Sequence, residues 1–199
     1  MSQSPSDPWP SAPLSGGSEA PSRTEEALST RRLYDGAVVK LRADRVRMAN
    51  GHEVVREVVE HSGAVTIVAL DADGRVLLVS QHRYPTGRAL LELPAGTLEP
   101  GEDPEACAVR ELEEETGFRA GRIERLGGFF VAPGYCTEYI HAYLATDLEP
   151  GTPGGDDDED IEVRALPLEE VLRLADTGEL EDAKSLASLL LYLRRRGGS

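Results

Sequence analysis

The stretch at residues 96–118 constrains the chain most, because it predicts a loop, a helix and a second loop. Asp103 and Pro104 mark the start of the helix, since an Asp carboxylate can cap it and Pro suits the first helical position. Gly117 marks its end, because glycine readily takes the left-handed conformation that closes a helix. The helix carries a dense acidic run, and that run needs a physical explanation.

Glu111, Glu114 and Glu115 lie three and four residues apart, so they share one face of the predicted helix. Like charges at this spacing cost about a few tenths of a kcal/mol per pair. The simplest interpretation is a solvated acidic face. The alternative is a hard-cation site, where carboxylate oxygens hold Mg²⁺ or Mn²⁺ beside a substrate phosphate. Arg110 favours the second interpretation, because a guanidinium can hold a carboxylate in place by a forked pair.

The same stretch resembles the Nudix box at every defined position of that motif. The matching residues are Gly96, Glu102, Arg110, Glu111, Leu112, Glu114, Glu115, Gly117 and Phe118. The resemblance implies the Nudix fold, an α/β/α sandwich with a mixed central sheet. It also implies hydrolysis of a nucleoside diphosphate linked to another moiety. A Nudix fold that has lost its activity is the alternative.

Roles for the box residues follow from the resemblance. It implies Mg²⁺ as the cofactor, with Mn²⁺ as an alternative, and Glu111 and Glu115 as metal ligands. Glu114 would be a further ligand or the group that orients water, and Arg110 would hold the carboxylates for catalysis. We expect Glu102 to stabilise the loop–helix–loop rather than to bind metal.

Two further features resemble the ADP-ribose pyrophosphatase subfamily. The Leu-Glu-Leu-Pro-Ala-Gly run at residues 91–96 looks like that branch, in which the backbone carbonyl of the Ala, here Ala95, is a metal ligand. Pro133 lies sixteen residues after Gly117, and a Pro near that offset marks the subfamily. An ordinary corner between a strand and a loop is the alternative. The resemblance implies that Glu138 accepts hydrogen bonds from the substrate.

The implied reaction is Mg²⁺-dependent hydrolysis of ADP-ribose to AMP and ribose 5-phosphate. One alternative is another substrate, such as GDP-mannose or a dinucleotide. A different class of alternative is a Nudix module that binds ADP-ribose without cleaving it. The intact trio Glu111, Glu114 and Glu115 argues against this last alternative, because a binding module has no need to keep like charges crowded together.

Two arginines are candidates for binding the substrate. Arg83 leaves an apolar strand just before a loop, a common place for binding residues, and the subfamily carries a substrate-binding arginine at this strand end. Arg56 lies in a matching Arg-Glu-Val context, where the subfamily has an arginine that contacts substrate beside the partner subunit. An ordinary exposed strand arginine is an equal alternative for Arg56.

An acidic, Gly- and Pro-rich segment at residues 147–160 has the composition of a mobile loop. In the resembled subfamily such a loop closes on the substrate and supplies an acid, as general base or as metal ligand. We assign this role to Glu159. Asp157, Asp158 and Glu162 are rivals, because the alignment within an acidic run is ambiguous.

The chain divides into a leader and one domain. Residues 1–30 are rich in Ser, Pro, Gly and Glu, which predicts a disordered leader. Residues 31–199 are expected to form the Nudix domain. Its first part, residues 31–60, is a small β region with a hairpin turn at Asn50 and Gly51. In the resembled subfamily this region helps to form a homodimer.

The core elements are read from hydrophobic patterns. The apolar run at residues 64–70 predicts a central strand, with residues 76–79 as its hairpin partner. A C-terminal helix is predicted at residues 185–196, where leucines recur at helical spacing. The leucines expected in the core are Leu186, Leu189, Leu190 and Leu193.

Composition excludes some partners. The net charge of −15 argues against non-specific binding to nucleic acid or to an anionic membrane. No apolar run approaches about 18 residues, so no membrane span is expected. Cys107 and Cys136 have no metal-ligand spacing, which favours reduced thiols and a cytoplasmic location. A small nucleoside diphosphate sugar is the expected partner.

Overall fold

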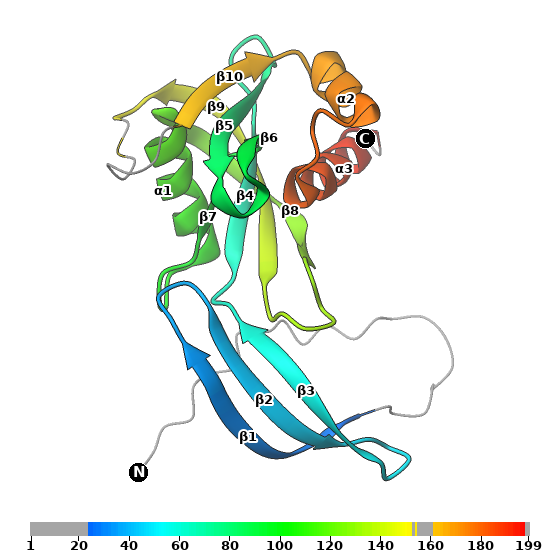
Figure 1. The fold of residues 1–199 in the computed structure, drawn as a ribbon. Coiled ribbons are helices and arrows are strands. Elements are labelled where there is room, and N and C mark those ends of the chain that lie inside the picture. The colour runs from blue at the N-terminus through cyan, green and yellow to red at the C-terminus, as the bar shows by residue number, and fades with distance from the viewer. Residues whose placement is uncertain (1–23, 153, 155–160, 198–199) are drawn as a thin grey trace.

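The computed structural model describes residues 24–152, 154 and 161–197 (Figure 1). Most of the predicted leader, residues 1–23, lies outside this described part. Strand β1 (Glu26–Asp35) begins within the last residues of the predicted leader, so the predicted boundary at residue 30 is wrong. Pairing with the next strand explains the early start: Glu26 lies opposite Arg47 and forms an ion pair with it, 3.0 Å between Oε2 and Nη1.

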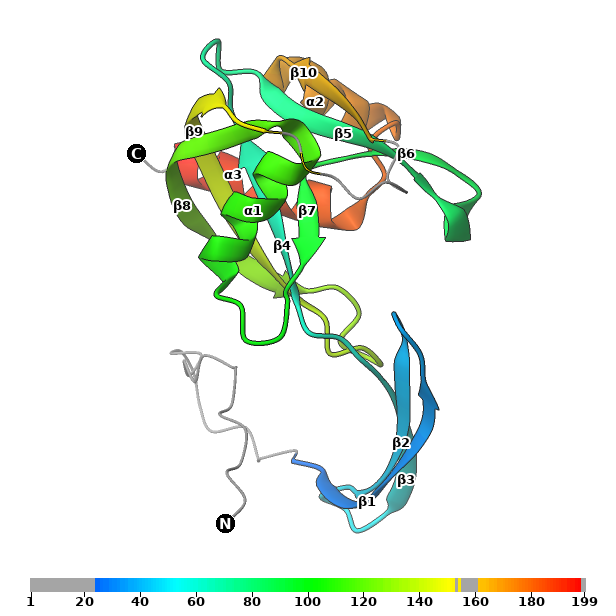
Figure 2. The same ribbon diagram turned by 90° about the vertical axis from the view of Figure 1, so that its left-hand side faces the viewer.

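The N-terminal sheet consists of β1, β2 (Lys40–Arg47) and β3 (Glu53–Glu60), antiparallel and in that order. The hairpin between β2 and β3 forms where it was predicted. Gly51 takes a φ of 83°, and Asn50 accepts a hydrogen bond from the His52 amide through Oδ1. Figures 1 and 2 show that this sheet stands apart from the rest of the described chain.

The main body contains two sheets. The first has the order β7-β4-β9-β8, formed by β7 (Ala95–Thr97), β4 (Ala64–Ala69), β9 (Tyr139–Pro150) and β8 (Phe118–Phe130). It is mixed, since β4 and β9 are parallel and the other pairs are antiparallel. Every residue of β4 is buried, as predicted for a central strand.

The second sheet has the order β10-β5-β6, formed by β10 (Ile161–Leu166), β5 (Val76–Arg83) and β6 (Arg88–Glu92). The prediction that β5 is the hairpin partner of β4 is therefore wrong. Only one bridge, between Leu70 and Val76, joins the two segments. The turn at residues 71–74 does form, but β7 and β9 already occupy the two edges of β4. A short 3₁₀ helix, η1 (Tyr84–Thr86), caps the projecting β5–β6 hairpin (Figure 2).

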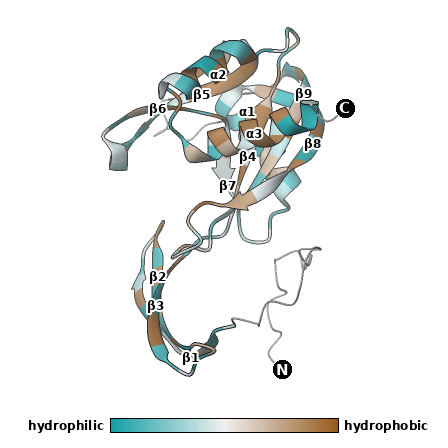
Figure 3. Cartoon of the chain, turned by 90° about the vertical axis from the view of Figure 1, so that its right-hand side faces the viewer, coloured by the Kyte–Doolittle hydropathy of each residue, from teal (hydrophilic) through white to brown (hydrophobic). Residues whose placement is uncertain are grey.

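Three helices complete the predicted α/β/α sandwich. Helix α1 (Pro104–Thr116) lies on one side of the sheets, and α2 (Leu168–Thr177) and α3 (Ala183–Gly197) lie on the other (Figure 1). Strand β4 serves both cores, because its side chains alternate: Ile67 packs in the core with α1, whereas Val68 packs in the core with α2 and α3. Figure 3 shows apolar residues where α2 and α3 face the sheets.

The buried face of α3 differs from the predicted leucine stripe. Leu189 is buried, but Leu190 is 58% exposed and Leu186 is 38% exposed. Ser185 and Ser188 are fully buried in their place. Ser185 belongs inside because its hydroxyl accepts a hydrogen bond from the Leu93 amide at 2.7 Å. No helix in the part of the chain that the structure describes is long and apolar enough to span a membrane.

Candidate active site

Helix α1 begins and ends where its sequence predicts. The Asp103 side chain accepts hydrogen bonds from the amides of Glu105 and Ala106, at 3.0 and 3.3 Å. Gly117 closes the helix with a φ of 72°. Ala108 and Leu112 are fully buried against the sheet, so the carboxylate face of the helix is left to line a cavity.

Glu102 fastens the preceding loop to α1. Arg110 donates to both of its oxygens, with Nε to Oε1 at 2.9 Å and Nη2 to Oε2 at 3.0 Å. The amide of Glu99 also donates to Glu102 Oε2, at 2.9 Å. These bonds, above all those from Arg110, lower the pKa of Glu102 to about 2. The geometry agrees with the stabilising role expected of Glu102.

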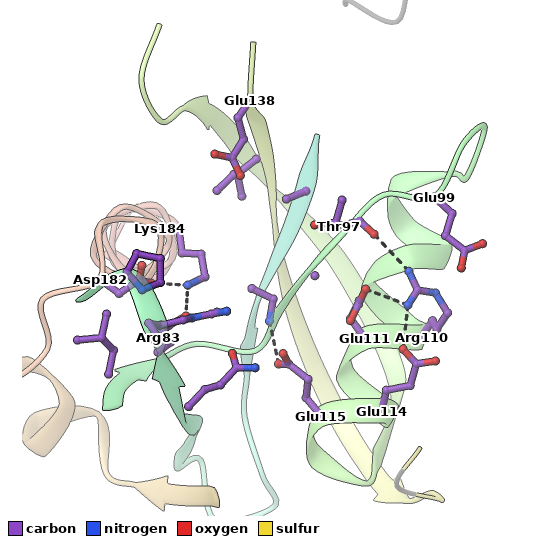
Figure 4. Close-up of a pocket in the computed structure, with 18 of the residues that line it drawn as sticks. Arg83, Thr97, Glu99, Arg110, Glu111, Glu114, Glu115, Glu138, Asp182 and Lys184 are labelled. Carbon is purple, nitrogen blue, oxygen red and sulfur yellow. Dashed lines mark hydrogen bonds and ion pairs between the residues drawn. The ribbon is translucent and has the colours of Figure 1, made fainter. Parts of the chain in front are cut away.

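Arg110 also holds two of the carboxylates on α1. Its Nη1 lies 2.9 Å from Glu111 Oε1 and 2.8 Å from Glu114 Oε2 (Figure 4). The neighbouring carboxylates, first of all Glu102, raise the pKa of Arg110, so it stays cationic. One guanidinium therefore offsets the repulsion among several negative charges on this face.

Close contact with the loop backbone completes this wall. A Cβ atom at Gly96 would lie 1.8 Å from Glu111 Cδ, so only glycine allows the carboxylate to approach the loop. The Ala95 amide donates to Glu115 Oε2 at 3.0 Å. The loop and α1 thus bring together the residues predicted to bind metal.

The chemistry of this donor set fits a hard divalent cation. The side chains offer only carboxylate oxygens, which Mg²⁺ and Mn²⁺ prefer. Within residues 24–152, 154 and 161–197, no group of three or more His, Cys, Asp or Glu side chains is already gathered around one point. The carboxylates are instead held by Arg110 and by the Ala95 amide.

A cavity of about 680 Å³ brings most of the predicted site residues together (Figure 4). The predicted residues that line it are Arg83, Ala95, Arg110, Glu111, Glu114, Glu115 and Glu138. Arg56 does not line it: it lies on β3, where its guanidinium donates to Glu25 at 2.6 and 3.1 Å. Glu159, Asp157 and Asp158 lie outside the described residues. Glu162 is exposed on β10 and pairs with Arg164 at 3.0 Å.

The opposite wall of the cavity carries cations around a buried carboxylate. Arg83 donates to both oxygens of Glu92, at 2.9 and 2.7 Å, and Lys184 donates to the same carboxylate. Glu92 is only 2% exposed. Burial alone would raise its pKa, but hydrogen bonds and charge from Arg83 and Lys184 outweigh burial and hold the pKa below its ordinary value.

Sequence reasoning missed part of this wall. Glu92 had a signal, because a charged residue within the apolar residues 90–93 is a candidate for a paired, buried group. Asp182 and Lys184 had no such signal in the sequence. Asp182 lies just before the C-terminal helix α3 and Lys184 lies in its first turn, far from the box in the chain. Both line the cavity.

Glu138 connects the cavity to the end of the N-terminal sheet. Its Oε1 lies 3.8 Å from His61 Nε2, just after β3. Thr137 bonds to the same segment, because its hydroxyl accepts from the His61 amide at 2.9 Å. The loop that carries Glu138 is thereby attached to the chain leaving the N-terminal sheet.

A mixed sheet between helices, with an arginine-braced acidic helix lining a cavity, defines a metal-dependent hydrolase of the Nudix class. A family model described as the NUDIX domain matches residues 60–189, and the chain belongs to this family. It is 38% identical over 172 residues to an ADP-ribose pyrophosphatase of Bacillus subtilis (strain 168), covering 85% of this chain and 92% of that one.

Two other proteins are similar over most of the chain. An ADP-ribose pyrophosphatase of Mycobacterium tuberculosis (strain ATCC 25618 / H37Rv) is 43% identical over 168 residues, covering 83% of this chain and 81% of that protein. A solved structure titled as an ADP compounds hydrolase superposes with a TM-score of 0.80 at 25% identity, covering 87% of this chain and 95% of that chain.

Proposed function

We propose that this protein hydrolyses the diphosphate of ADP-ribose to AMP and ribose 5-phosphate, with Mg²⁺ or Mn²⁺ as cofactor. The observation that carries the proposal is one cavity lined by the box carboxylates on one side and by Arg83 on the other. Similarity to two ADP-ribose pyrophosphatases over more than four fifths of the chain supports the choice of substrate.

The residues of the chain have distinct roles in this reaction. Glu111, Glu115 and the Ala95 carbonyl would hold the divalent metal, which supplies charge neutralisation at the diphosphate and acidifies water. Arg110 keeps Glu111 and Glu114 in place. Glu114 would be a further metal ligand or the group that orients the attacking water.

Three more residues act on the substrate or on its proton. Arg83 donates hydrogen bonds to the substrate with its guanidinium plane fixed by Glu92. Glu138 accepts hydrogen bonds from the substrate. Glu159 would act as the general base or as an additional metal ligand.

We further propose that the protein is a cytoplasmic homodimer and that the N-terminal sheet forms part of the dimer interface. Apolar side chains exposed on or beside that sheet support this assignment, among them Val38 at 84% and Val55 at 62% exposure. Arg56 then reaches the partner subunit's cavity. The two cysteines, Cys107 and Cys136, are free thiols, which is consistent with a reducing compartment.

Truncation tests the dimer. Deleting residues 1–23 should leave light-scattering mass and activity unchanged, because β1 begins only at Glu26. Deleting residues 1–60 removes the whole sheet and should give an inactive monomer. Full activity of a monomer at working concentration would contradict the proposed interface.

Product analysis tests the reaction. ADP-ribose, GDP-mannose, NADH and diadenosine polyphosphates are incubated with the protein and Mg²⁺, Mn²⁺ or EDTA, and the products are separated by chromatography. Metal-dependent release of AMP and ribose 5-phosphate, fastest from ADP-ribose, is expected. Faster cleavage of GDP-mannose would change the assigned substrate. Tight calorimetric binding of ADP-ribose without AMP release would identify a binding module.

A further inference from the structure

Lys184 is a cavity residue to which neither the box nor the features shared with the subfamily gave a role. It lies in the first turn of α3, and its side chain, 15% exposed, lines the same cavity as the box carboxylates. The chain has only two lysines, Lys184 and Lys40, and all its other basic side chains apart from histidine are arginines. Lys40 is exposed on β2 in the N-terminal sheet and does not line the cavity.

The contacts of Lys184 leave it able to bind a ligand. Its Nζ pairs with Glu92 Oε2 and, at 3.0 Å, with Asp182 Oδ2. An ammonium group has three N–H donors, so one donor remains after these two carboxylates are served. Figure 4 shows Lys184 and Arg83 on the same side of the cavity, across from Glu111 and Glu115.

The charges on the two walls indicate which cations are available to an anion. Among the described residues, the cations that line the cavity are Arg83, Arg110 and Lys184. Arg110 is committed to Glu102, Glu111 and Glu114 within the acidic wall. A substrate phosphate that lies across the cavity from the acidic wall therefore meets Arg83 and Lys184.

Glu92 fixes both cations before any ligand arrives. The carboxylate is almost fully buried, and a buried charge is strongly destabilising unless it is paired. Here it is paired twice, with the Arg83 guanidinium and the Lys184 ammonium. Cations that are already ordered lose less side-chain entropy on binding, which favours affinity.

We propose that Lys184 donates its remaining N–H to a phosphate oxygen of the nucleoside diphosphate substrate, beside Arg83, and that Glu92 is the positioning residue for both cations. This inference rests on the proposed function, because it requires a phosphorylated ligand in this cavity. The competing role for Lys184 is that of a counter-ion to Glu92 with no contact to substrate.

Amine labelling of the wild-type, full-length protein separates these roles. The protein is treated with limiting acetic anhydride in EDTA, with and without ADP-ribose, and acetylation at each lysine is measured by mass spectrometry. ADP-ribose should slow the labelling of Lys184 severalfold and leave Lys40, the internal control, unchanged. Adenosine, which has no phosphate, should protect neither lysine. Equal labelling of Lys184 with and without bound ADP-ribose would overturn the proposal.

Glu92→Gln tests the positioning role in the same assay. Without the negative charge, Lys184 should be acetylated faster in the absence of ligand, and ADP-ribose should protect it less. A change confined to Lys184 would support the positioning role, because loss of folding stability alone does not predict it. Unchanged labelling and unchanged protection would overturn the role of Glu92.

Calorimetry in EDTA measures the contribution to affinity. Lys184→Gln should weaken the binding of ADP-ribose about tenfold or more, the size expected for one hydrogen bond to a charged group. Lys40→Gln is the matched control and should bind like the wild type. A Lys184→Gln protein that melts at a lower temperature but binds ADP-ribose normally would show a structural role only. If this variant does not fold, the labelling of the wild type decides.

Failure of the inference can be told apart from failure of the proposed function. If the wild type binds GDP-mannose but not ADP-ribose, the assigned substrate is wrong, and the same labelling and variants are measured with GDP-mannose. If it binds neither compound, both proposals fall. If ADP-ribose binds and is cleaved while Lys184 is not protected, only the Lys184 proposal is overturned.

Discussion

The two walls of the cavity solve the same electrostatic problem with opposite signs. On the α1 wall, several carboxylates surround one guanidinium, that of Arg110. On the facing wall, two cations, Arg83 and Lys184, surround one buried carboxylate, that of Glu92. Each wall keeps a group of like charges close together because at least one opposite charge lies among them.

The walls differ in how the chain builds them. The acidic wall comes from one continuous segment, in which a loop and a helix follow each other. The cationic wall comes from the β5–β6 hairpin and the start of α3, and α3 lies far from that hairpin in the chain. The acidic wall can therefore be recognised from a local motif, whereas the cationic wall exists only after the sheet and α3 have packed.

The largest predicted effect is a loss of kcat in a variant outside the acidic wall, and it tests whether that wall holds all the catalytic acids. Glu159→Gln should lower kcat for ADP-ribose about 10²- to 10⁴-fold and leave KM nearly unchanged, since a general base or ligand brought in by a closing loop acts mainly in the transition state. The change is measured by steady-state kinetics. The rival acids Asp157, Asp158 and Glu162 are changed to their amides one at a time in the same assay. A large loss at one of these instead would move the assignment, and four silent changes would leave the box carboxylates as the only acids.

The next effect tests the acidic wall directly. Glu115→Gln keeps the shape of the side chain and removes its charge, so turnover should fall about 10²-fold or more. Glu113→Gln is the matched control on the same helix, because Glu113 pairs with Arg119 at 2.7 Å and does not line the cavity. Melting temperature should not fall, since relief of like-charge repulsion favours the helix. Near-normal turnover of Glu115→Gln would remove it from the ligand set.

A smaller effect is expected from the loop that touches this wall. Gly96→Ala puts a methyl group where Glu111 Cδ lies 1.8 Å away, so the carboxylate must move. Misplacement of a catalytic group by about 1 Å can cost up to about 10²-fold, and we expect a loss of about ten- to a hundredfold in kcat/KM. Gly134→Ala, with nothing within 4 Å of the added Cβ, is the control. Unchanged kinetics of Gly96→Ala would mean that Glu111 need not lie against the loop.

The smallest effect concerns acid stability. The pKa of Glu102 is lowered from 4.5 to about 2 in the folded protein, chiefly by Arg110. A depressed pKa contributes stability that is present above the unfolded value of 4.5 and is lost as the pH falls toward 2. Glu102→Gln should therefore be less stable than the wild type near neutral pH, and the gap in melting temperature should narrow in acid. Glu169→Gln, an exposed change on α2, is the control. A gap that does not depend on pH would show that Glu102 acts through shape rather than charge.

Much of the acidic wall was determined by the sequence alone. Helix caps depend on residues within one turn, so Asp103 and Gly117 could be read directly and the structure has both. The spacing of the three box glutamates fixes their common face in the same way. The hairpin at Gly51 and the buried strand β4 were equally local signals, and the family match confirms the fold and class that the box implied.

Only the tertiary structure decided the rest. Strand pairing depends on which edges are available, so β5 pairs with β6 and β10 although the sequence predicted a hairpin with β4. The start of β1 within the predicted leader likewise depends on Arg47 of β2. Glu92 pairs with two cations because β5 brings Arg83 to it and α3 brings Lys184. Long-range packing sets such contacts, and a pattern within one short segment does not contain them.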